Sequence, residues 1–180
     1  VRLADGSVTL AGFDVAPDLR WALVTALARA GRADEARIAE ELARDNTISG
    51  RERAAAARAV LPSAEAKAQA WNDAALRDDI SNETQRSIAY VFDCSEQEDV
   101  LAEYLERYLT VADTIWEEKG TQIASTMLEY MFPRVLTGQA TLDRVDAWLA
   151  TSSANPAAKR YVSEARADVV RALAAQRADA

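Results

Sequence analysis

Between residues 95 and 133 the chain carries its longest run of apolar residues at helical spacing. The first half of the run has the i, i+1, i+4, i+5 pattern of one broad helical face, made by Val100, Leu101, Tyr104, Leu105, Tyr108 and Leu109. Ser95 and Glu98 form a capping-box pattern, which predicts that a helix starts at Ser95. A second run starts after Gly120 and repeats the spacing until Pro133 ends it. This segment therefore predicts the hydrophobic centre of an all-helical domain.

Further helices are predicted on both sides of this centre. The first starts at Pro17 and ends at Gly31, a residue type favoured just past a helix C-terminus. Its expected apolar face carries Leu19, Leu23, Leu27 and Ala30, widened by Trp21 and Val24. In the next helix we expect Ile38, Ala39, Leu42 and Ala43 to be buried, with Glu40 and Glu41 facing solvent. The other predicted N-terminal caps are Ser49, Ser63, Ser81, Thr141 and the Asn155-Pro156 pair.

The predicted helices recur at a regular spacing. Pairs of them begin near residues 17, 49 and 81, about 32 residues apart. Two helices per unit at such a period are typical of helical-hairpin repeats, which stack into a superhelix. The units match no tetratricopeptide or ankyrin consensus. The predicted fold is therefore all-α, an irregular HEAT-like array of antiparallel helical hairpins, with residues 17–180 forming a single helical-repeat domain.

Residues 1–16 belong to no predicted helix. The weak alternation around Asp5-Gly6-Ser7 fits a short hairpin or an extended lead-in, and a frayed end is an equal alternative. The chain also starts with Val1 rather than Met. We therefore expect residues 1–16 to be the remnant of an upstream domain of a longer protein.

Charge and cysteine content narrow the class of protein. A formal net charge of −8, with acidic residues spread along the chain, argues against nucleic acid as a partner, because phosphate binding needs clustered Lys and Arg. The single cysteine, Cys94, allows no internal disulfide and suits a reducing cytoplasm. No apolar run approaches the roughly 20 residues that span a membrane. We therefore expect a cytoplasmic protein with neither nucleic acid nor membrane as a partner.

The sequence offers little catalytic chemistry. It contains no histidine, which excludes an H-E-x-x-H zinc site and a histidine base for a Ser or Cys nucleophile. No glycine-rich phosphate-binding motif is present. The acidic pairs Glu40/Glu41, Asp78/Asp79 and Glu117/Glu118 could serve glycoside or metal chemistry, but they fall on polar helix faces or helix ends. A solvated surface is the better interpretation of these pairs, so we predict no catalytic residues and no metal ligands.

Three weaker candidates for functional residues remain. Cys94 precedes a predicted helix N-terminus, where the helix dipole lowers a thiol pKa, but without histidine a structural cysteine is favoured over a nucleophile. The Met and aromatic residues of 123–132 could line a ligand cavity, although such a stripe is more often core. Arg134 follows Phe132-Pro133 beside the most aromatic part of the chain and could hold a carboxylate. A surface arginine at a helix C-terminus is the alternative for Arg134.

Two long segments resemble a known family. They are DLRWALVTALARAGRADEARIAEELARDNTISGRERAAAARAVLPSAEAKAQAW and YLERYLTVADTIWEEKGTQIASTMLEYMFPR. They are similar to the C-terminal helical domain of actinobacterial aminopeptidase N, among the zinc gluzincin aminopeptidases, and to the corresponding domain of endoplasmic-reticulum aminopeptidases. The resemblance covers Asp18 to Arg177 and lies in long stretches of similar sequence rather than in a catalytic signature.

The resemblance implies a function for the chain as part of a larger enzyme. In such enzymes an upstream domain holds zinc and binds the free amino terminus of the peptide, and none of those motifs is present here. The C-terminal domain closes over the peptide chamber, restricts substrate access and can contact the distal end of the substrate. The implied partners are the upstream catalytic domain of the same chain and a peptide substrate. Arg134 is the one candidate for a substrate contact, and the chain by itself is expected to be inactive and without a cofactor.

Two other functions stay open at this point. A free-standing helical-repeat scaffold could bind a protein partner on its concave surface. A small all-α enzyme could work through carboxylates and arginine, but it needs inward-facing acids, whereas the helical faces place most acids outward.

Overall fold

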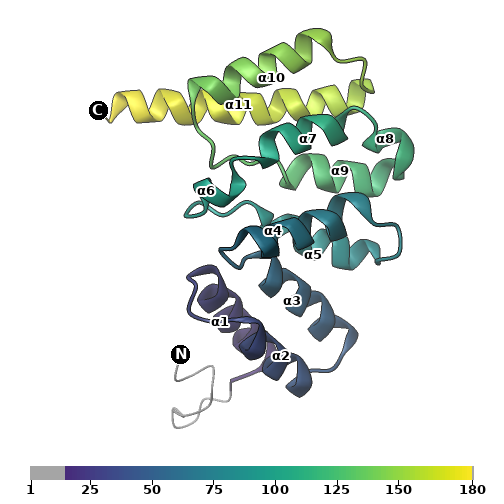
Figure 1. Ribbon diagram of the computed structural model, residues 1–180, viewed down its shortest axis with the longest axis vertical. Coiled ribbons are helices and arrows are strands. Elements are labelled where there is room, and N and C mark those ends of the chain that lie inside the picture. Colours follow the sequence, from purple (N-terminus) through teal and green to yellow (C-terminus); the bar gives the residue numbers. More distant parts are fainter. Residues whose placement is uncertain (1–14, 180) are drawn as a thin grey trace.

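The computed structural model describes residues 15–179, and all regular secondary structure in this range is helical (Figure 1). The helices are α1 (Pro17–Arg29), α2 (Glu35–Arg44), α3 (Ile48–Ala59), α4 (Ala64–Trp71), α5 (Asn82–Phe92), α6 (Glu98–Leu101), α7 (Tyr104–Ala112), α8 (Ile115–Glu118), α9 (Gly120–Tyr130), α10 (Gln139–Thr151) and α11 (Pro156–Ala178). A π-helical turn, η1 (Asn72–Leu76), continues α4. The predicted all-α class is confirmed. The predicted hairpin around Asp5-Gly6-Ser7 and almost all of the predicted lead-in lie outside the described residues.

Several helix starts were predicted by residue type. The side chains of Ser63 and Ser81 each accept a hydrogen bond from the backbone amide three residues later and cap α4 and α5, as expected. Asn155 caps α11 with Pro156 in the first turn, which is also confirmed. Gly31 has a φ of 66°, the left-handed conformation that glycine adopts most readily after a helix.

Three predicted caps are wrong. Helix α3 is capped by Thr47, whose hydroxyl accepts from the Gly50 amide at 2.9 Å, so Ser49 lies inside the first turn. Helix α10 starts after Gly138 in extended backbone, and Thr141 is a buried helical residue. Helix α6 starts after Gln97 rather than at Ser95. Of these three helices only α3 is capped by a side chain, and α6 and α10 start without a side-chain cap.

The predicted helix that starts at Ser95 is divided in the structure. A break at Ala102 and Glu103 separates α6 from α7, although both residues keep right-handed helical dihedral angles. Gly120, with a φ of 74°, starts α9 at a new direction after the short α8. The apolar residues of both runs are nevertheless buried as expected, including Tyr104, Tyr108, Met127 and Leu128. The segment is the centre of the core, although it is built from several short helices.

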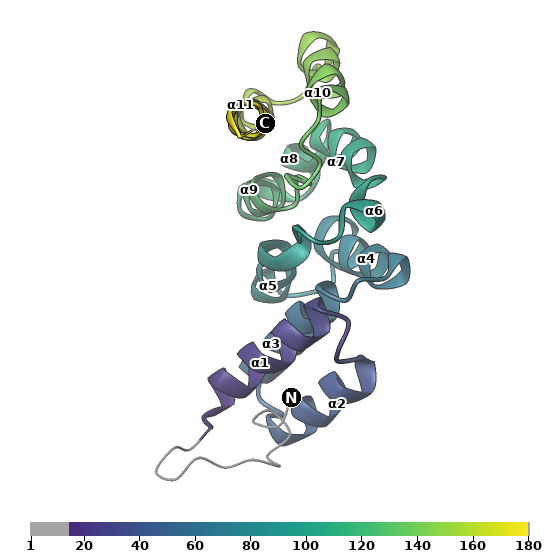
Figure 2. The same cartoon turned by 90° about the vertical axis from the view of Figure 1, so that its left-hand side faces the viewer.

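The helices stack in two layers (Figure 2). The first layer contains α1, α3, α5, α9 and α11, and each of these helices packs against the next. The second layer contains α2, α4, α6, α7 and α10, where the more extensive contacts are between α4 and α6 and between α7 and α10. First-layer helices start at residues 17, 48, 82, 120 and 156, so the predicted repeat continues along the chain. The helices of the first layer pack more closely than those of the second, so the stack curves towards the first layer and forms a superhelical array.

The predicted buried faces of α1 and α2 are partly wrong. In α1 the fully buried residues are Trp21, Val24 and Ala28, whereas Leu19 is 37% exposed. In α2, Ile38 is buried as expected, but Ala39 and Ala43 are exposed and Glu41 is completely buried. Glu41 tolerates burial because Arg20 Nε donates to its Oε1 at 2.7 Å. The partner lies on another helix, so the periodicity of α2 alone could not reveal it.

Candidate functional site

Arg134, the predicted substrate contact, lies in the segment between α9 and α10. Its Nε donates to Asp168 Oδ2 of α11 at 3.1 Å, and its side chain is 35% exposed. The next residue, Val135, donates its backbone N–H to Asp93 Oδ1 at 3.4 Å. Arg134 is therefore held between α5, α9 and α11, which all belong to the first layer.

A pocket of about 510 Å³ crosses the other end of the first layer. All its lining residues come from α1, α3, α5 or the first residues after them: Asp18, Trp21, Ala22, Thr25, Ala26, Arg29, Arg53, Ala56, Val60, Tyr90, Val91, Asp93 and Cys94. Helix α3 packs against both α1 and α5, so it forms the floor and the other two helices form the walls. The pocket is thus a groove on the first layer, and we call it the α1–α5 groove.

Both ends of the α1–α5 groove carry charge. At one end Arg53 pairs with Asp18 at 2.7 Å. At the other, Arg29 pairs with Glu96 at 2.7 Å, and this hydrogen bond lowers the pKa of Glu96. Asp93 is half-buried there, and burial raises the pKa of its carboxyl group. No ion pair reaches Asp93 among residues 15–179.

Tyr90 extends the groove towards α9. Its side chain is 54% exposed, which is high for an aromatic residue in the middle of a packed layer. The ring meets that of Tyr130 edge-on, with the centroids 4.3 Å apart. The two tyrosines therefore form an aromatic surface between the groove and the segment that holds Arg134.

Cys94, which lines the groove, lies next to the buried Lys67. Cys94 is buried, and burial raises the pKa of its thiol, so the predicted lowering by a helix dipole is wrong. Cys94 has no helix N-terminus to act on it because α6 starts four residues further on, at Glu98. Lys67 is completely buried, with its Nζ 3.9 Å from Cys94 Sγ. The structure supports the interpretation of Cys94 as a structural cysteine.

Lys67 holds three helices together. Its Nζ donates to the carbonyl oxygens of Ala59, at the end of α3, and Phe92, at the end of α5, at 2.9 and 2.8 Å. These carbonyls are the ones that a helix C-terminus leaves unpaired, and a cation is favoured there. Sequence reasoning did not single out Lys67. The available signal was its place one turn before Ala70 and Trp71, on the apolar face of α4.

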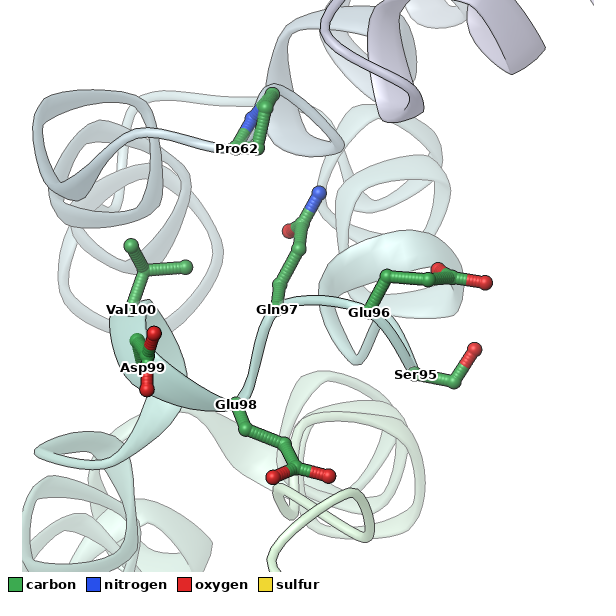
Figure 3. A pocket seen from close by; sticks show the side chains of 7 residues that line it. All are labelled: Pro62, Ser95, Glu96, Gln97, Glu98, Asp99 and Val100. Carbon is green, nitrogen blue, oxygen red and sulfur yellow. The ribbon is translucent and has the colours of Figure 1, made fainter.

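A second pocket lies beside the segment between α5 and α6 (Figure 3). It is lined by Pro62, Ser95, Glu96, Gln97, Glu98, Asp99 and Val100. Figure 3 shows the Gln97 side chain extending towards Pro62. Gln97 Nε2 donates to the carbonyl of Val60 at 2.8 Å, so this residue ties the α5–α6 segment to the end of α3. The acidic residues here form no group suited to a metal ion, and the described part of the chain holds none elsewhere.

The acidic pairs considered from the sequence do not converge on a pocket. Glu41 is buried against Arg20, whereas Glu40 is exposed. Asp78 and Asp79 are exposed and pair with Lys119 and Arg77. Glu117 and Glu118 are also exposed. The solvated-surface interpretation is therefore correct for every pair member except Glu41.

The Met and aromatic residues of 123–132 are mostly core. Met127, Leu128, Met131 and Phe132 are completely buried in the larger hydrophobic cluster. Tyr108 donates its hydroxyl to the carbonyl of Leu128 at 2.7 Å and packs edge-on against Phe132. These residues belong to the hydrophobic core, and none of them lines the α1–α5 groove or the pocket of Figure 3.

Within the described range, no helix is long and apolar enough to cross a membrane.

The fold and the site together define an all-α superhelical domain. Its first layer carries the α1–α5 groove and Arg134, which is paired with Asp168. A family model for the ERAP1-like C-terminal domain matches residues 2–171. The chain therefore belongs to the ERAP1-like C-terminal domain family.

A curated relative makes the likeness more specific. The chain is 41% identical over 178 residues to the aminopeptidase N of Streptomyces lividans. The alignment covers 99% of this chain and 21% of that protein, so the chain spans about a fifth of the length of its relative.

Proposed function

We propose that this chain is the C-terminal, non-catalytic domain of a zinc-dependent aminopeptidase N, and that it closes over the peptide chamber and restricts substrate access. The observation that carries the proposal is the 41% identity to an aminopeptidase N along almost the whole chain. The parent enzyme would remove N-terminal residues from peptides. The domain boundaries belong to the same proposal, with residues 1–16 a remnant of an upstream domain and residues 17–180 a single helical domain.

The chemistry of the chain supports a steric role. A catalytic zinc site needs a set of His and carboxylate ligands, and the sequence has no histidine. The residues of this chain therefore do not fit the metal, and zinc would be bound in another part of the parent enzyme. The chain by itself would be inactive, and its partners would be the catalytic domain and the peptide.

The first layer is the surface best suited to face the chamber. It carries the α1–α5 groove, the exposed edge of Tyr90 and the partly exposed guanidinium of Arg134. A wall of this kind positions a peptide and excludes water without taking part in bond cleavage. Cys94 is free and buried, which is compatible with the reducing cytoplasm that we propose as the location.

The proposal is tested by removing the domain. The full-length aminopeptidase and a version lacking residues 17–180 are compared on a short aminoacyl-anilide and on a series of longer peptides, with bound zinc measured in both. We expect the shortened enzyme to retain zinc and to change its rate or its preference for peptide length. If the two proteins treat every substrate alike, the chamber role is wrong and a partner-binding scaffold becomes the better explanation.

A further inference from the structure

Lys67 and Cys94 bring an amine and a thiol together inside the protein. Lys67 is completely buried, Cys94 is 2% exposed, and the distance between Nζ and Sγ is 3.9 Å. Lys67 lies on α4, and Cys94 lies just after the end of α5. The two residues are 27 positions apart in the sequence, so only the folded chain brings them into contact. Cys94 is the one cysteine of the chain, which leaves the Lys67 amine, rather than a second thiol, as the nucleophile beside it.

Hydrogen bonds fix the orientation of both groups. Lys67 Nζ is held by the carbonyl oxygens of Ala59 and Phe92. The Cys94 thiol donates its proton to the carbonyl oxygen of Val91 at 3.3 Å, while the sulfur accepts from the Lys67 ammonium group. A covalent bond between the two atoms requires them to approach by about 2 Å, which the flexible four-carbon side chain of lysine allows.

A small oxidant can reach the sulfur from the α1–α5 groove. Cys94 is one of the residues that line this groove, whereas Lys67 does not line it. Hydrogen peroxide, an oxidant little larger than water, can therefore approach Cys94 through the groove. Burial lowers the pKa of the Lys67 ammonium group, which increases the share of free amine, the nucleophilic form. The groove thus gives access to the sulfur, and the buried lysine supplies the nucleophile.

We propose that Lys67 and Cys94 form an oxidation-dependent cross-link, a sulfenamide in which Nζ is bonded to Sγ. In the first step hydrogen peroxide transfers one oxygen atom to the thiolate and its O–O bond breaks, so that Cys94 becomes a sulfenic acid. The second oxygen leaves as hydroxide and takes up the proton that the thiol released. In the second step the free amine attacks the sulfur, the S–O bond breaks, and the oxygen leaves as water with a proton from the amine. Overall the sulfur loses two electrons and the peroxide is reduced to water.

The cross-link is reversible and changes the bonding of two helix ends. An external thiol attacks Sγ and breaks the N–S bond, which returns the Lys67 amine, and a second thiol then restores Cys94. The nitrogen of a sulfenamide is neutral and carries one N–H. It can therefore donate to only one of the two carbonyls that the ammonium group bonds, those of Ala59 and Phe92. Oxidation thus leaves the end of α3 or of α5 without its donor, and this chemistry does not depend on the proposed function.

Peptide mapping of the folded chain tests the cross-link. The protein is treated with hydrogen peroxide at about pH 9, because burial raises the pKa of the Cys94 thiol and the thiolate is the form that reacts. Free thiols are then alkylated, and the chain is digested with trypsin, which does not cut after a bridged lysine. The expected product is peptide 59–77 joined to peptide 87–107, with a mass about 2 Da below the sum of the two, and dithiothreitol should separate them. If the oxidised protein holds only sulfinic or sulfonic acid at Cys94, or a disulfide between two chains, the proposal is wrong.

Controls identify the amine that reacts. Lys67→Met should abolish the cross-link and let Cys94 proceed to sulfinic acid, whereas Lys159→Met on α11 is the matched control and should keep the wild-type yield. Lys67→Arg keeps a cation that can donate to the helix carbonyls but stays protonated, so it should also abolish the cross-link even if Lys67→Met fails to fold. Wild-type protein unfolded in urea should give no cross-link. An unchanged yield in Lys67→Arg or in the unfolded protein would overturn the proposal.

Discussion

The ammonium group of Lys67 donates a hydrogen bond of 2.8 Å to the carbonyl oxygen of Phe92, the last residue of α5. A second bond, of 2.9 Å, reaches the carbonyl of Ala59 at the end of α3. The Phe92 ring also lies 5.2 Å from the same nitrogen, within range of a cation–π interaction. One buried side chain on α4 thus closes the ends of the two first-layer helices that it packs against.

We expect Lys67→Met to reduce the free energy of unfolding by about 1–3 kcal/mol, because methionine fills similar space but leaves two buried carbonyls without a donor. Chemical denaturation at neutral pH measures the change. Lys159→Met, at a partly exposed position on α11, is the control, and its free energy of unfolding should stay within about 0.5 kcal/mol of the wild-type value. A Lys67→Met protein as stable as the wild type would show that water or backbone movement satisfies the two carbonyls.

Asp45 should make stability depend on acid pH. Hydrogen bonds from Trp21 Nε1 and the Thr47 hydroxyl, both 2.8 Å, lower the pKa of its carboxyl group. Below an ordinary aspartate pKa of about 3.9, the unfolded chain takes up a proton that the folded chain still excludes. The stabilisation from Asp45 is therefore present above about pH 4 and is lost as the pH falls through its lowered folded pKa.

Asp45→Asn removes this titration. Urea unfolding at neutral pH and at about pH 3 should show that the variant loses less stability on acidification than the wild type does. Asp143→Asn should follow the wild-type curve, since Asp143 is an exposed residue of α10. Parallel pH curves for Asp45→Asn and the wild type would contradict the assignment.

Gly50 is required by a close approach of the backbone. A Cβ added at this position would lie 1.8 Å from the carbonyl oxygen of Asp45, a contact that only movement of the main chain can relieve. Gly50→Ala should therefore reduce the free energy of unfolding by about 1–3 kcal/mol, as overpacking does elsewhere. Thermal denaturation would measure this loss.

Gly138 supplies the matched control for Gly50. It has extended backbone at a φ of −153°, and a Cβ there would meet no atom within 4 Å. Gly138→Ala should be neutral or should stabilise the protein by up to about 1 kcal/mol, because alanine restricts the unfolded chain. If both variants lost the same stability, the close contact at Gly50 would not be the cause.

Arg134 allows function and stability to be separated. Its pair with Asp168 is about one-third exposed, and pairs of this kind contribute about 0–1 kcal/mol, so Arg134→Ala should leave the isolated chain folded. In the full-length aminopeptidase we expect the same variant to weaken the processing of longer peptides more than that of a short aminoacyl-anilide. Steady-state kinetics on both substrate types would measure the difference.

Arg107→Ala is the control for Arg134→Ala. Arg107 is also an exposed, ion-paired arginine, but it lies on α7 in the second layer. It should leave the kinetics unchanged. Equal effects of the two variants on long and short substrates would remove Arg134 as a candidate substrate contact.

Local residue patterns predicted much of the fold. Ser63, Ser81 and Asn155 cap helices as expected because capping is decided by a side chain and an amide two or three residues away. The buried residues of the core centre were also found, since burial follows the spacing on a helix. The predicted helix from Ser95 was too long, because nothing in the spacing marks the break at Ala102 and Glu103.

The candidate site was predicted less well. Arg134 was identified as a residue beside the aromatic centre, but its partner Asp168 lies 34 positions away on α11. Asp93 and Tyr90 were not identified at all, and the groove that they line exists only where α1, α3 and α5 lie together. Sequence spacing describes one helix at a time, and such a groove has walls from several helices.

The sequence by itself determined that the chain is helical, where several of its helices begin, which segment forms the centre of the core, and which family the chain resembles. The first three of these properties depend on short-range hydrogen bonding and on the helical period, and the family resemblance depends on long stretches of similar sequence. Only the tertiary structure decided that Glu41, Lys67 and Gln97 are buried, and that a groove lies between α1 and α5. Burying a polar group is favourable only when a partner is in place, and for these three residues the partners come from segments 8 to 68 positions away that meet only in the folded chain.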